Sequence, residues 1–380
     1  MQAVPRRRWP LTKECVNYLL KKMQSQARKW TRKNLQYAAK PALARVSALL
    51  PAMNAQFRAL NPALWPAREE SAPAQQHVPQ APAGDAQWLD GTFTERGRTL
   101  TYKLHVPPQP VRGAPRPLVV MLHGCTQDAQ DFAAGTQMNA QAAALGAIVL
   151  YPEQSSRDNP KKCWNWFTPQ NQQRDRGEPA VLAALTRSIA ESHAVDRSRI
   201  YVAGLSAGGA MADILGAAYP DMFAAIGVHS GLPRGCATDV MSALTAMRIG
   251  CATHGTAHGA VPPTIVFHGD ADSTVHVSNG IAVVDAALQA RETPGGDVQA
   301  SEGESAQGQR YSKTLYQDSA GRTTVEYWQL HGAGHAWSGG NPGGSYTDPA
   351  GVDATAEMLR FFLAHPKKHA DQARLSATAG

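Results

Sequence analysis

A serine set between small residues is the first place in this chain where chemistry can be expected. Ser206 is the centre of the pentapeptide Gly204-Leu205-Ser206-Ala207-Gly208, with an apolar stretch before it and an alanine-rich stretch after it. A nucleophilic serine on a tight turn from a strand to a helix needs such small neighbours, because the two backbones approach closely there. The alternative is a glycine-rich turn without chemistry, but the strand and the helix expected on its two sides favour a nucleophile.

A serine nucleophile needs a base that accepts its proton and a carboxylate that orients the base. Among the 13 histidines of the chain, His335 is our candidate base, because it lies in a glycine-rich loop directly after an apolar stretch. His331 ends that same stretch, whereas His268 and His123 each precede a glycine at the end of another one. We expect structural roles for these three side chains.

Two aspartates compete for the part of the orienting carboxylate. Asp270 and Asp272 both follow the apolar stretch 264–269, and either could reach an imidazole from there. Both also lie between Ser206 and His335, in the order serine, acid, histidine that chains with this kind of turn show.

Attack by a serine on a carbonyl carbon places negative charge on the carbonyl oxygen, which must meet backbone N–H donors. Ala207 follows the nucleophile and begins the expected helix, so its N–H is one candidate donor. The second is the N–H of Cys125, next to Gly124 after an early apolar stretch. A structural role of the Cys125 side chain, bridged to Cys163, is compatible with this prediction because the donor belongs to the backbone.

The elements that must position these residues alternate between strand and helix. A hairpin that turns at Arg96-Gly97 is expected in 91–107, further strands in 117–124, 147–154, 199–204, 224–231, 264–272 and 325–335, and helices in 133–146, 178–193 and 352–365. This alternation predicts an α/β fold with a mostly parallel sheet and helices on both faces. The aromatic loop within 155–176 is expected either in the core or along a substrate groove, and 294–308 is expected to be a surface excursion.

Charge divides the chain into parts. Residues 1–45 hold twelve Lys and Arg and one Glu, a net charge of +11, whereas the whole chain has +7, which leaves −4 for the remainder. Apolar positions three and four apart in 11–38 predict an amphipathic helix, which either lies on an anionic or lipid-coated surface or packs on the body. We therefore expect a basic helical arm in 1–45, an Ala/Pro/Gln-rich linker in 46–87, a catalytic domain in 88–366 and a polar tail in 367–380.

Several classes of function lack the signals that they require. We find no secretion signal and no membrane span, which predicts a cytoplasmic protein, or an extracellular one if the true start differs. Nucleic-acid binding is not expected because no base-reading motif accompanies the basic residues. We find no motif for binding a metal, a phosphate or a dinucleotide, and therefore expect no cofactor. If the compartment is oxidising, we expect the disulfide pairs Cys125–Cys163 and Cys236–Cys251; in a cytosol these would be thiols.

Seven short motifs resemble one known family. They are LHGCTQ (122–127), LYPEQ (150–154), CWNWF (163–167), GLSAGGAM (204–211), SGLPRGCA (230–237), HGDADSTV (268–275) and GAGHAWSGG (332–340). Together they resemble the esterase family of poly(3-hydroxybutyrate) depolymerases, which also includes feruloyl and acetylxylan esterases. The resemblance implies an α/β-hydrolase fold over the whole body of the chain.

The resemblance also assigns roles. It implies Asp272 rather than Asp270 as the acid, so that Ser206, Asp272 and His335 form a catalytic triad, with Cys125 at the oxyanion hole. Aromatic side chains within these motifs are expected to bind substrate: Trp164, Trp166 and Trp337.

The leading hypothesis is a serine esterase that cleaves poly(3-hydroxybutyrate) or its oligomers, on intracellular granules to which the basic arm would attach. A feruloyl or acetylxylan esterase is the alternative of the same class. A non-catalytic protein that binds granules or another surface is the alternative of a different class.

Overall fold

The computed structural model describes residues 86–108, 114–251, 261–290 and 296–367. The predicted basic arm in 1–45, nearly all of the linker in 46–87 and nearly all of the tail in 367–380 lie outside these residues. Within the described ranges, no helix is both long and apolar enough to cross a membrane.

A ten-stranded sheet runs through the domain, with strands in the order β1-β2-β4-β3-β5-β6-β7-β10-β9-β8. The central six strands from β4 to β10 pair in parallel, whereas the outer pairs on both sides are antiparallel. The prediction of a mostly parallel sheet is therefore confirmed. The strands are β1 (Gln87–Glu95), β2 (Arg98–Val106), β3 (Arg116–Leu122), β4 (Ile148–Glu153), β5 (Val195–Leu205), β6 (Ala225–His229), β7 (Thr264–Gly269), β8 (Val298–Glu304), β9 (Arg310–Gln317) and β10 (Thr323–Leu330). A separate short pair consists of β11 (Trp337–Ser338) and β12 (Thr347–Asp348).

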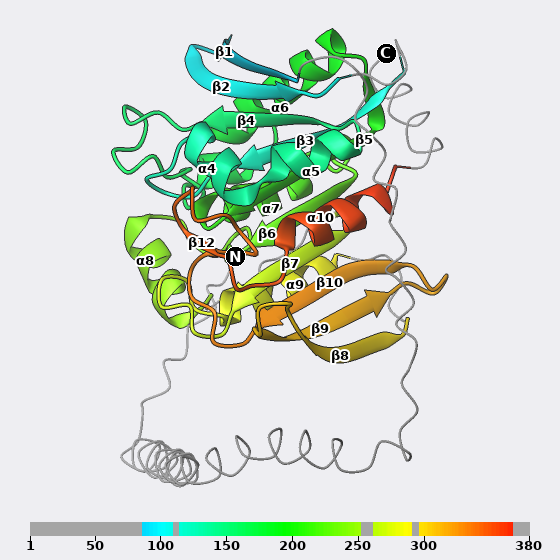
Figure 1. Cartoon of the computed structure of the whole chain (residues 1–380). Coiled ribbons are helices and arrows are strands. Elements are labelled where there is room, and N and C mark those ends of the chain that lie inside the picture. Colours follow the sequence, from blue (N-terminus) through cyan, green and yellow to red (C-terminus); the bar gives the residue numbers. More distant parts are fainter. Residues whose placement is uncertain (1–85, 109–113, 252–260, 291–295, 368–380) are drawn as a thin grey trace, which may run out of the picture. The chain divides into compact units, whose positions relative to one another are not determined.

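Helices cover both faces of this sheet (Figure 1). Side chains of α4 (Ala129–Thr136), α5 (Met138–Ala144) and α10 (Ala354–Leu363) pack on one face in a single apolar cluster. Those of α6 (Gly177–Ser192), α7 (Ala207–Ala218) and α9 (Ser278–Gln289) pack on the other face. The central strands β3 and β6 are buried along their whole length, because they have helices on both sides. The remaining helical elements are η3 (Pro169–Gln172) and α8 (Val240–Ile249).

Two local predictions, a hairpin turn and a disulfide pairing, are confirmed. The first hairpin turns at Arg96 and Gly97, both of which have positive φ angles, 52° and 76°. The expected disulfide bonds Cys125–Cys163 and Cys236–Cys251 are both present.

Elsewhere the sequence-based assignment is wrong or incomplete. The single helix expected in 133–146 is two helices, because Gln137 adopts a left-handed conformation (φ 54°) that ends α4 and precedes α5. The surface excursion expected in 294–308 contains β8, an exposed edge strand paired with β9. The helix α8 was not expected, although Asp239 and Ser242 form a capping box at its start.

Candidate active site

The turn that carries Ser206 is a strained nucleophile elbow. Ser206 lies between β5 and α7 with φ 58° and ψ −120°, a conformation that a side chain other than glycine rarely adopts. Its backbone N–H donates to the His229 carbonyl at 2.9 Å, which holds the turn against β6. A Cβ atom on Gly208 would collide with the Leu122 carbonyl oxygen, so the small residue there is required by close packing of β3. The predicted elbow therefore has the geometry that its sequence pattern implies.

His335 and Asp272 meet at the carboxyl end of the parallel strands. The Nδ1 atom of His335 lies 2.7 Å from Oδ2 of Asp272. The other carboxylate oxygen, Oδ1, accepts hydrogen bonds from the backbone N–H groups of Thr274 and Val275, both at 2.8 Å. These three donors fix the orientation of the carboxylate, so the imidazole is held by a group that cannot itself rotate freely.

The charge state of Asp272 follows from its surroundings. Burial alone would raise the pKa of this carboxyl, but the hydrogen bond and charge of His335 and the N–H of Val275 outweigh it, so the pKa lies below the ordinary value. When the His335 ring is neutral, an ionised Asp272 accepts the proton on Nδ1, so that the lone pair of Nε2 is available. Such a ring can accept a proton from a hydroxyl.

Asp270 contacts the start of the loop that carries His335. Its carboxylate accepts from the Gly332 N–H at 2.7 Å and contacts the His331 ring at 2.9 Å. Of the two aspartates that the sequence left open, only Asp272 contacts His335 in the described part of the chain. Asp270 anchors the start of the loop on which His335 lies, and His331 has the structural role that we expected.

Two backbone N–H groups near the nucleophile have no acceptor within the described part of the chain. Among the described residues, neither the Cys125 N–H nor the Ala207 N–H has a hydrogen-bond partner, whereas the neighbouring Gly124 and Thr126 donate to Gln127 Oε1 and the Lys161 carbonyl. Cys125 lines the same cavity as Ser206 and His335, which has a volume of about 200 Å³. Both predicted N–H groups are thus available for an oxyanion.

His123 fixes the loop that carries the Cys125 donor. Its Nδ1 lies 2.7 Å from the Gly124 carbonyl oxygen, and its Nε2 accepts the Gln154 N–H at 3.1 Å. Burial lowers the pKa of His123, so the ring is neutral and the proton lies on Nδ1. The disulfide to Cys163 ties the same loop from its other side.

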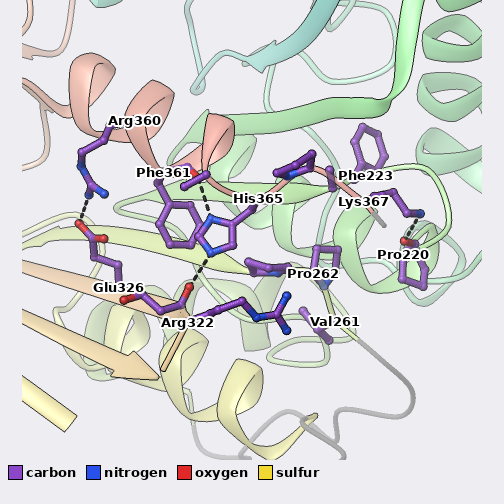
Figure 2. Close-up of a pocket in the computed structure, with 15 residues that line it drawn as sticks. Pro220, Phe223, Val261, Pro262, Arg322, Glu326, Arg360, Phe361, His365 and Lys367 are labelled. Atoms are coloured by element: carbon purple, nitrogen blue, oxygen red, sulfur yellow. Dashed lines mark hydrogen bonds and ion pairs between the residues drawn. The ribbon is translucent and has the colours of Figure 1, made fainter. Parts of the chain in front are cut away.

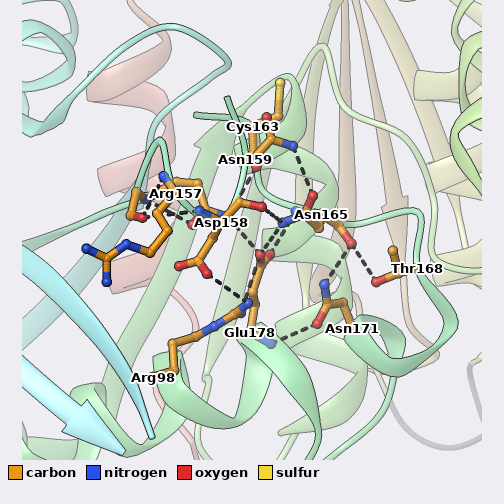
Figure 3. Close-up of polar contacts among 11 residues, drawn as sticks. Arg98, Arg157, Asp158, Asn159, Cys163, Asn165, Thr168, Asn171 and Glu178 are labelled. Carbon is orange, nitrogen blue, oxygen red and sulfur yellow. Dashed lines mark hydrogen bonds and ion pairs between the residues drawn. The ribbon is translucent and has the colours of Figure 1, made fainter. Parts of the chain in front are cut away.

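A buried glutamate holds the neighbouring aromatic loop (Figure 3). Glu178, at the start of α6, accepts from the Asn165 N–H at 2.8 Å, from Asn165 Nδ2 at 2.6 Å and from Gln154 Nε2 at 2.7 Å. Arg98 adds a positive charge 3.5 Å away. Burial raises the pKa of Glu178, although the hydrogen bonds from Asn165 and Gln154 oppose this effect. Through Gln154, the network reaches His123 and the Cys125 loop.

His229 joins the elbow to the loop of the base, a role that our sequence analysis missed. Its carbonyl oxygen accepts from Ser206, while its ring Nε2 accepts the Ser338 N–H at 3.0 Å. The ring is stacked between Phe267 and Trp337, and its burial, with smaller effects of nearby histidines, lowers the pKa to about 3. The only signal in the sequence was a histidine at the end of an apolar strand.

The three tryptophans that we expected to bind substrate lie in the core. Trp164 and Trp337 are fully buried and Trp166 is 5% exposed. Trp164 packs against His123, and Trp337 packs between Phe132 and His229. None of the three lines the cavity at Ser206. The structure gives them packing roles, because the loop that carries two of them is pulled onto the body by Glu178 and the Cys125–Cys163 disulfide.

The cavity is lined instead by side chains to which the sequence analysis assigned no role. Met247 of α8, Thr274 after β7 and Tyr346 before β12 surround Ser206 and His335. They come from three separate segments, so only the fold brings them together.

A larger cavity, of about 720 Å³, lies where β6, β7 and β10 begin (Figure 2). Arg360 is paired with Glu326 there, and Arg322 with Asp318. Ser206 and His335 follow the carboxyl ends of their strands, at the opposite edge of the sheet, so this cavity is not the candidate active site.

Comparison with known proteins places these features in context. Residues 100–288 match the family model described as esterase PHB depolymerase. Poly(3-hydroxyalkanoate) depolymerase C of Paucimonas lemoignei is 33% identical over 257 residues, which cover 64% of this chain and 59% of that protein. Feruloyl esterase B of Thermothelomyces thermophilus is 35% identical over 128 residues, or 33% of this chain and 43% of that protein. The chain thus spans less than two thirds of either relative.

Among solved structures, an acetyl xylan esterase from Aspergillus awamori superposes with a TM-score of 0.57 at 18% identity, over 74% of this chain and 100% of that one. At this identity the likeness is one of fold. The predicted α/β-hydrolase fold is confirmed.

Proposed function

We propose that this chain, whose residues 100–288 match the family model described as esterase PHB depolymerase, is a serine esterase that hydrolyses poly(3-hydroxybutyrate) or its oligomers. The observation that carries the proposal is the 2.7 Å contact between His335 and Asp272 beside the cavity that Ser206 lines. The name of the relative from Paucimonas lemoignei supports the polyester as substrate class.

The first half of the reaction forms an acyl-enzyme. Ser206 Oγ attacks the ester carbonyl carbon while His335 Nε2 takes the hydroxyl proton, and Asp272 stabilises the imidazolium that results. The N–H groups of Cys125 and Ala207 donate to the oxyanion, and the start of α7 adds the positive end of its helix dipole. His335 then gives its proton to the alcohol oxygen that leaves, which is the hydroxyl end of the released polyester chain.

The second half hydrolyses the acyl-enzyme. His335 takes a proton from water, whose oxygen attacks the acyl carbon and displaces Ser206. Ser206 regains its proton from His335, and the acyl group leaves as a free carboxylic acid. The fixed contacts of Asp272 keep Nε2 free to act in both halves.

A second candidate of the same class is a feruloyl or acetylxylan esterase, since a relative with the first name also matches this chain. The catalytic steps would be the same, and only the acyl and alcohol groups of the ester would differ. A direct comparison of substrates separates the two.

The experiment incubates the purified chain with amorphous poly(3-hydroxybutyrate) granules and, in parallel, with methyl ferulate and acetylated xylan. We expect 3-hydroxybutyrate or its oligomers to be released from the granules at a rate well above that of ferulate or acetate. Release of ferulate or acetate alone would establish the second candidate. A Ser206→Ala variant serves as the control for each reaction.

Location and attachment are further parts of the proposal. The two disulfide bonds support an oxidising compartment, because cytosolic proteins rarely retain such bonds, and this favours the extracellular alternative over the cytoplasmic one. Attachment of residues 1–45 to an anionic granule surface rests on their charge alone. Granule binding that weakens as salt rises in the full chain, but does not depend on salt in a chain that lacks residues 1–84, would support it.

A further inference from the structure

Helix α8 exposes an unusual number of large apolar side chains. Val240, Met241, Leu244 and Ile249 are 56%, 72%, 45% and 73% exposed, whereas Ala243 and Ala246 on the other side of the helix are buried. The other five exposed large apolar residues of the described chain lie on five different segments. Single exposed apolar side chains are ordinary, but four on one short helix mark a surface that contacts something.

The exposed helix is held firmly in place. The disulfide Cys236–Cys251 joins the segments at its two ends, and Asp239 caps its first turn. Its last turn is bound to the start of α9, where Asn279 Nδ2 donates to the Ala246 carbonyl at 2.8 Å. The backbone N–H of His276 also donates to the Met247 carbonyl at 2.7 Å. The apolar face is therefore presented by a fixed element.

This face is continuous with the candidate active site. Met247 lies on the same helix and lines the cavity with Ser206 and His335. Tyr346 is 46% exposed and lines that cavity as well. An apolar surface that touches α8 thus reaches the rim of the site where the ester bond is cleaved.

We propose that the exposed face of α8, formed by Val240, Met241, Leu244 and Ile249, is the surface by which the enzyme adsorbs to a solid, uncharged aliphatic polyester. This inference rests on the proposed function. A cavity of about 200 Å³ takes only a short part of a polymer chain, so the rest of an insoluble particle stays outside and contacts the surface around the rim. Burial of apolar side chains against its methyl and methylene groups is favourable.

The charge of the helix favours a polyester over a membrane. Between Asp239 and Gly250, Arg248 is the only cationic side chain. A helix that lies on an anionic lipid surface usually has several Lys or Arg on its polar face. Binding to an uncharged ester surface does not require such cationic side chains.

The test uses the full chain with four substitutions, Val240→Gln, Met241→Gln, Leu244→Gln and Ile249→Gln, which keep good helix formers at exposed positions. A matched control carries Leu89→Gln and Val298→Gln, exposed apolar residues on the two outermost strands. Adsorption to amorphous poly(3-hydroxybutyrate) particles is measured by depletion in about 1 M NaCl, where the screening length of ~3 Å suppresses attraction by the basic residues 1–45.

We expect the α8 variant to adsorb at least about tenfold more weakly than the wild type, which corresponds to ~1.4 kcal/mol. The control should adsorb as the wild type does, and all three proteins should hydrolyse p-nitrophenyl butyrate at equal rates. The inference would be overturned if the α8 variant adsorbed to the polyester as strongly as the wild type does. It would also be overturned if the four substitutions weakened binding to phosphatidylcholine vesicles but not to the polyester. Failure of the proposed function is distinguishable, because the wild type would then release neither 3-hydroxybutyrate nor its oligomers from the particles, whether or not it adsorbs to them.

Discussion

Replacement of Glu178 by alanine removes the acceptor at the centre of the network in Figure 3. Three hydrogen bonds of 2.8 Å or less, two from Asn165 and one from Gln154, lose their partner together. A donor left unsatisfied inside a protein costs about 1–3 kcal/mol. Because water can enter the space of the deleted carboxylate and satisfy part of the set, we expect a loss of about 3–5 kcal/mol in the free energy of unfolding.

Urea denaturation followed by tryptophan fluorescence measures this loss, and the melting temperature should fall by roughly 10 °C. Glu302→Ala, at an exposed position on β8, is the matched control and should change stability by less than about 0.5 kcal/mol. The turnover number of the folded variant should fall too, since Gln154 also holds His123 and hence the Cys125 loop. If Glu178→Ala and Glu302→Ala proved equally stable, the network would not hold the loop.

Three further predictions concern the elbow and the acid. Asp272→Asn should lower the turnover number about 10³- to 10⁴-fold with little change in fold, since the amide no longer holds the proton on Nδ1 of His335; steady-state kinetics with circular dichroism check this. Gly208→Ala should prevent correct folding, because its methyl group would collide with β3, whereas Gly334→Ala has open space around it and should express as the wild type does. Acid should destabilise the protein: the folded pKa of Asp272 lies below the ordinary 3.8, so its contribution is full above that value and is lost as the pH falls through the folded pKa. Urea titrations from about pH 6 to pH 3 should show this fall, with a smaller slope in Asp272→Asn.

The parts of the fold that local residue patterns determine were predictable. Strand, small-residue turn and alanine-rich helix around Ser206 form one continuous segment, and so do the hairpin at Arg96 and the loop that ends in His335. Asp272 could be chosen over Asp270 only through the resemblance to a family. The sequence alone placed both carboxylates after the same strand, and the choice depends on which one points toward His335.

What the sequence could not predict depends on contacts between distant segments. The sequence left Trp164 open between the core and a substrate groove, and the structure places it in the core because a glutamate and a disulfide partner from other segments hold its loop. His229 is a positioning residue through a bond to Ser338, 109 positions later in the chain. The edge strand β8 and its neighbour β9 are too polar to show the apolar stretch that identified the central strands.

The most direct test of the account is covalent labelling of the nucleophile. A p-nitrophenyl alkylphosphonate ester reacts with an activated serine and leaves a stable adduct that peptide mass spectrometry can locate. We predict a stoichiometric adduct on Ser206 with loss of p-nitrophenyl butyrate hydrolysis, and in Ser206→Ala neither adduct nor turnover, a loss of at least about 10³-fold. An adduct on a different residue, or a Ser206→Ala variant that keeps its turnover, would contradict the account.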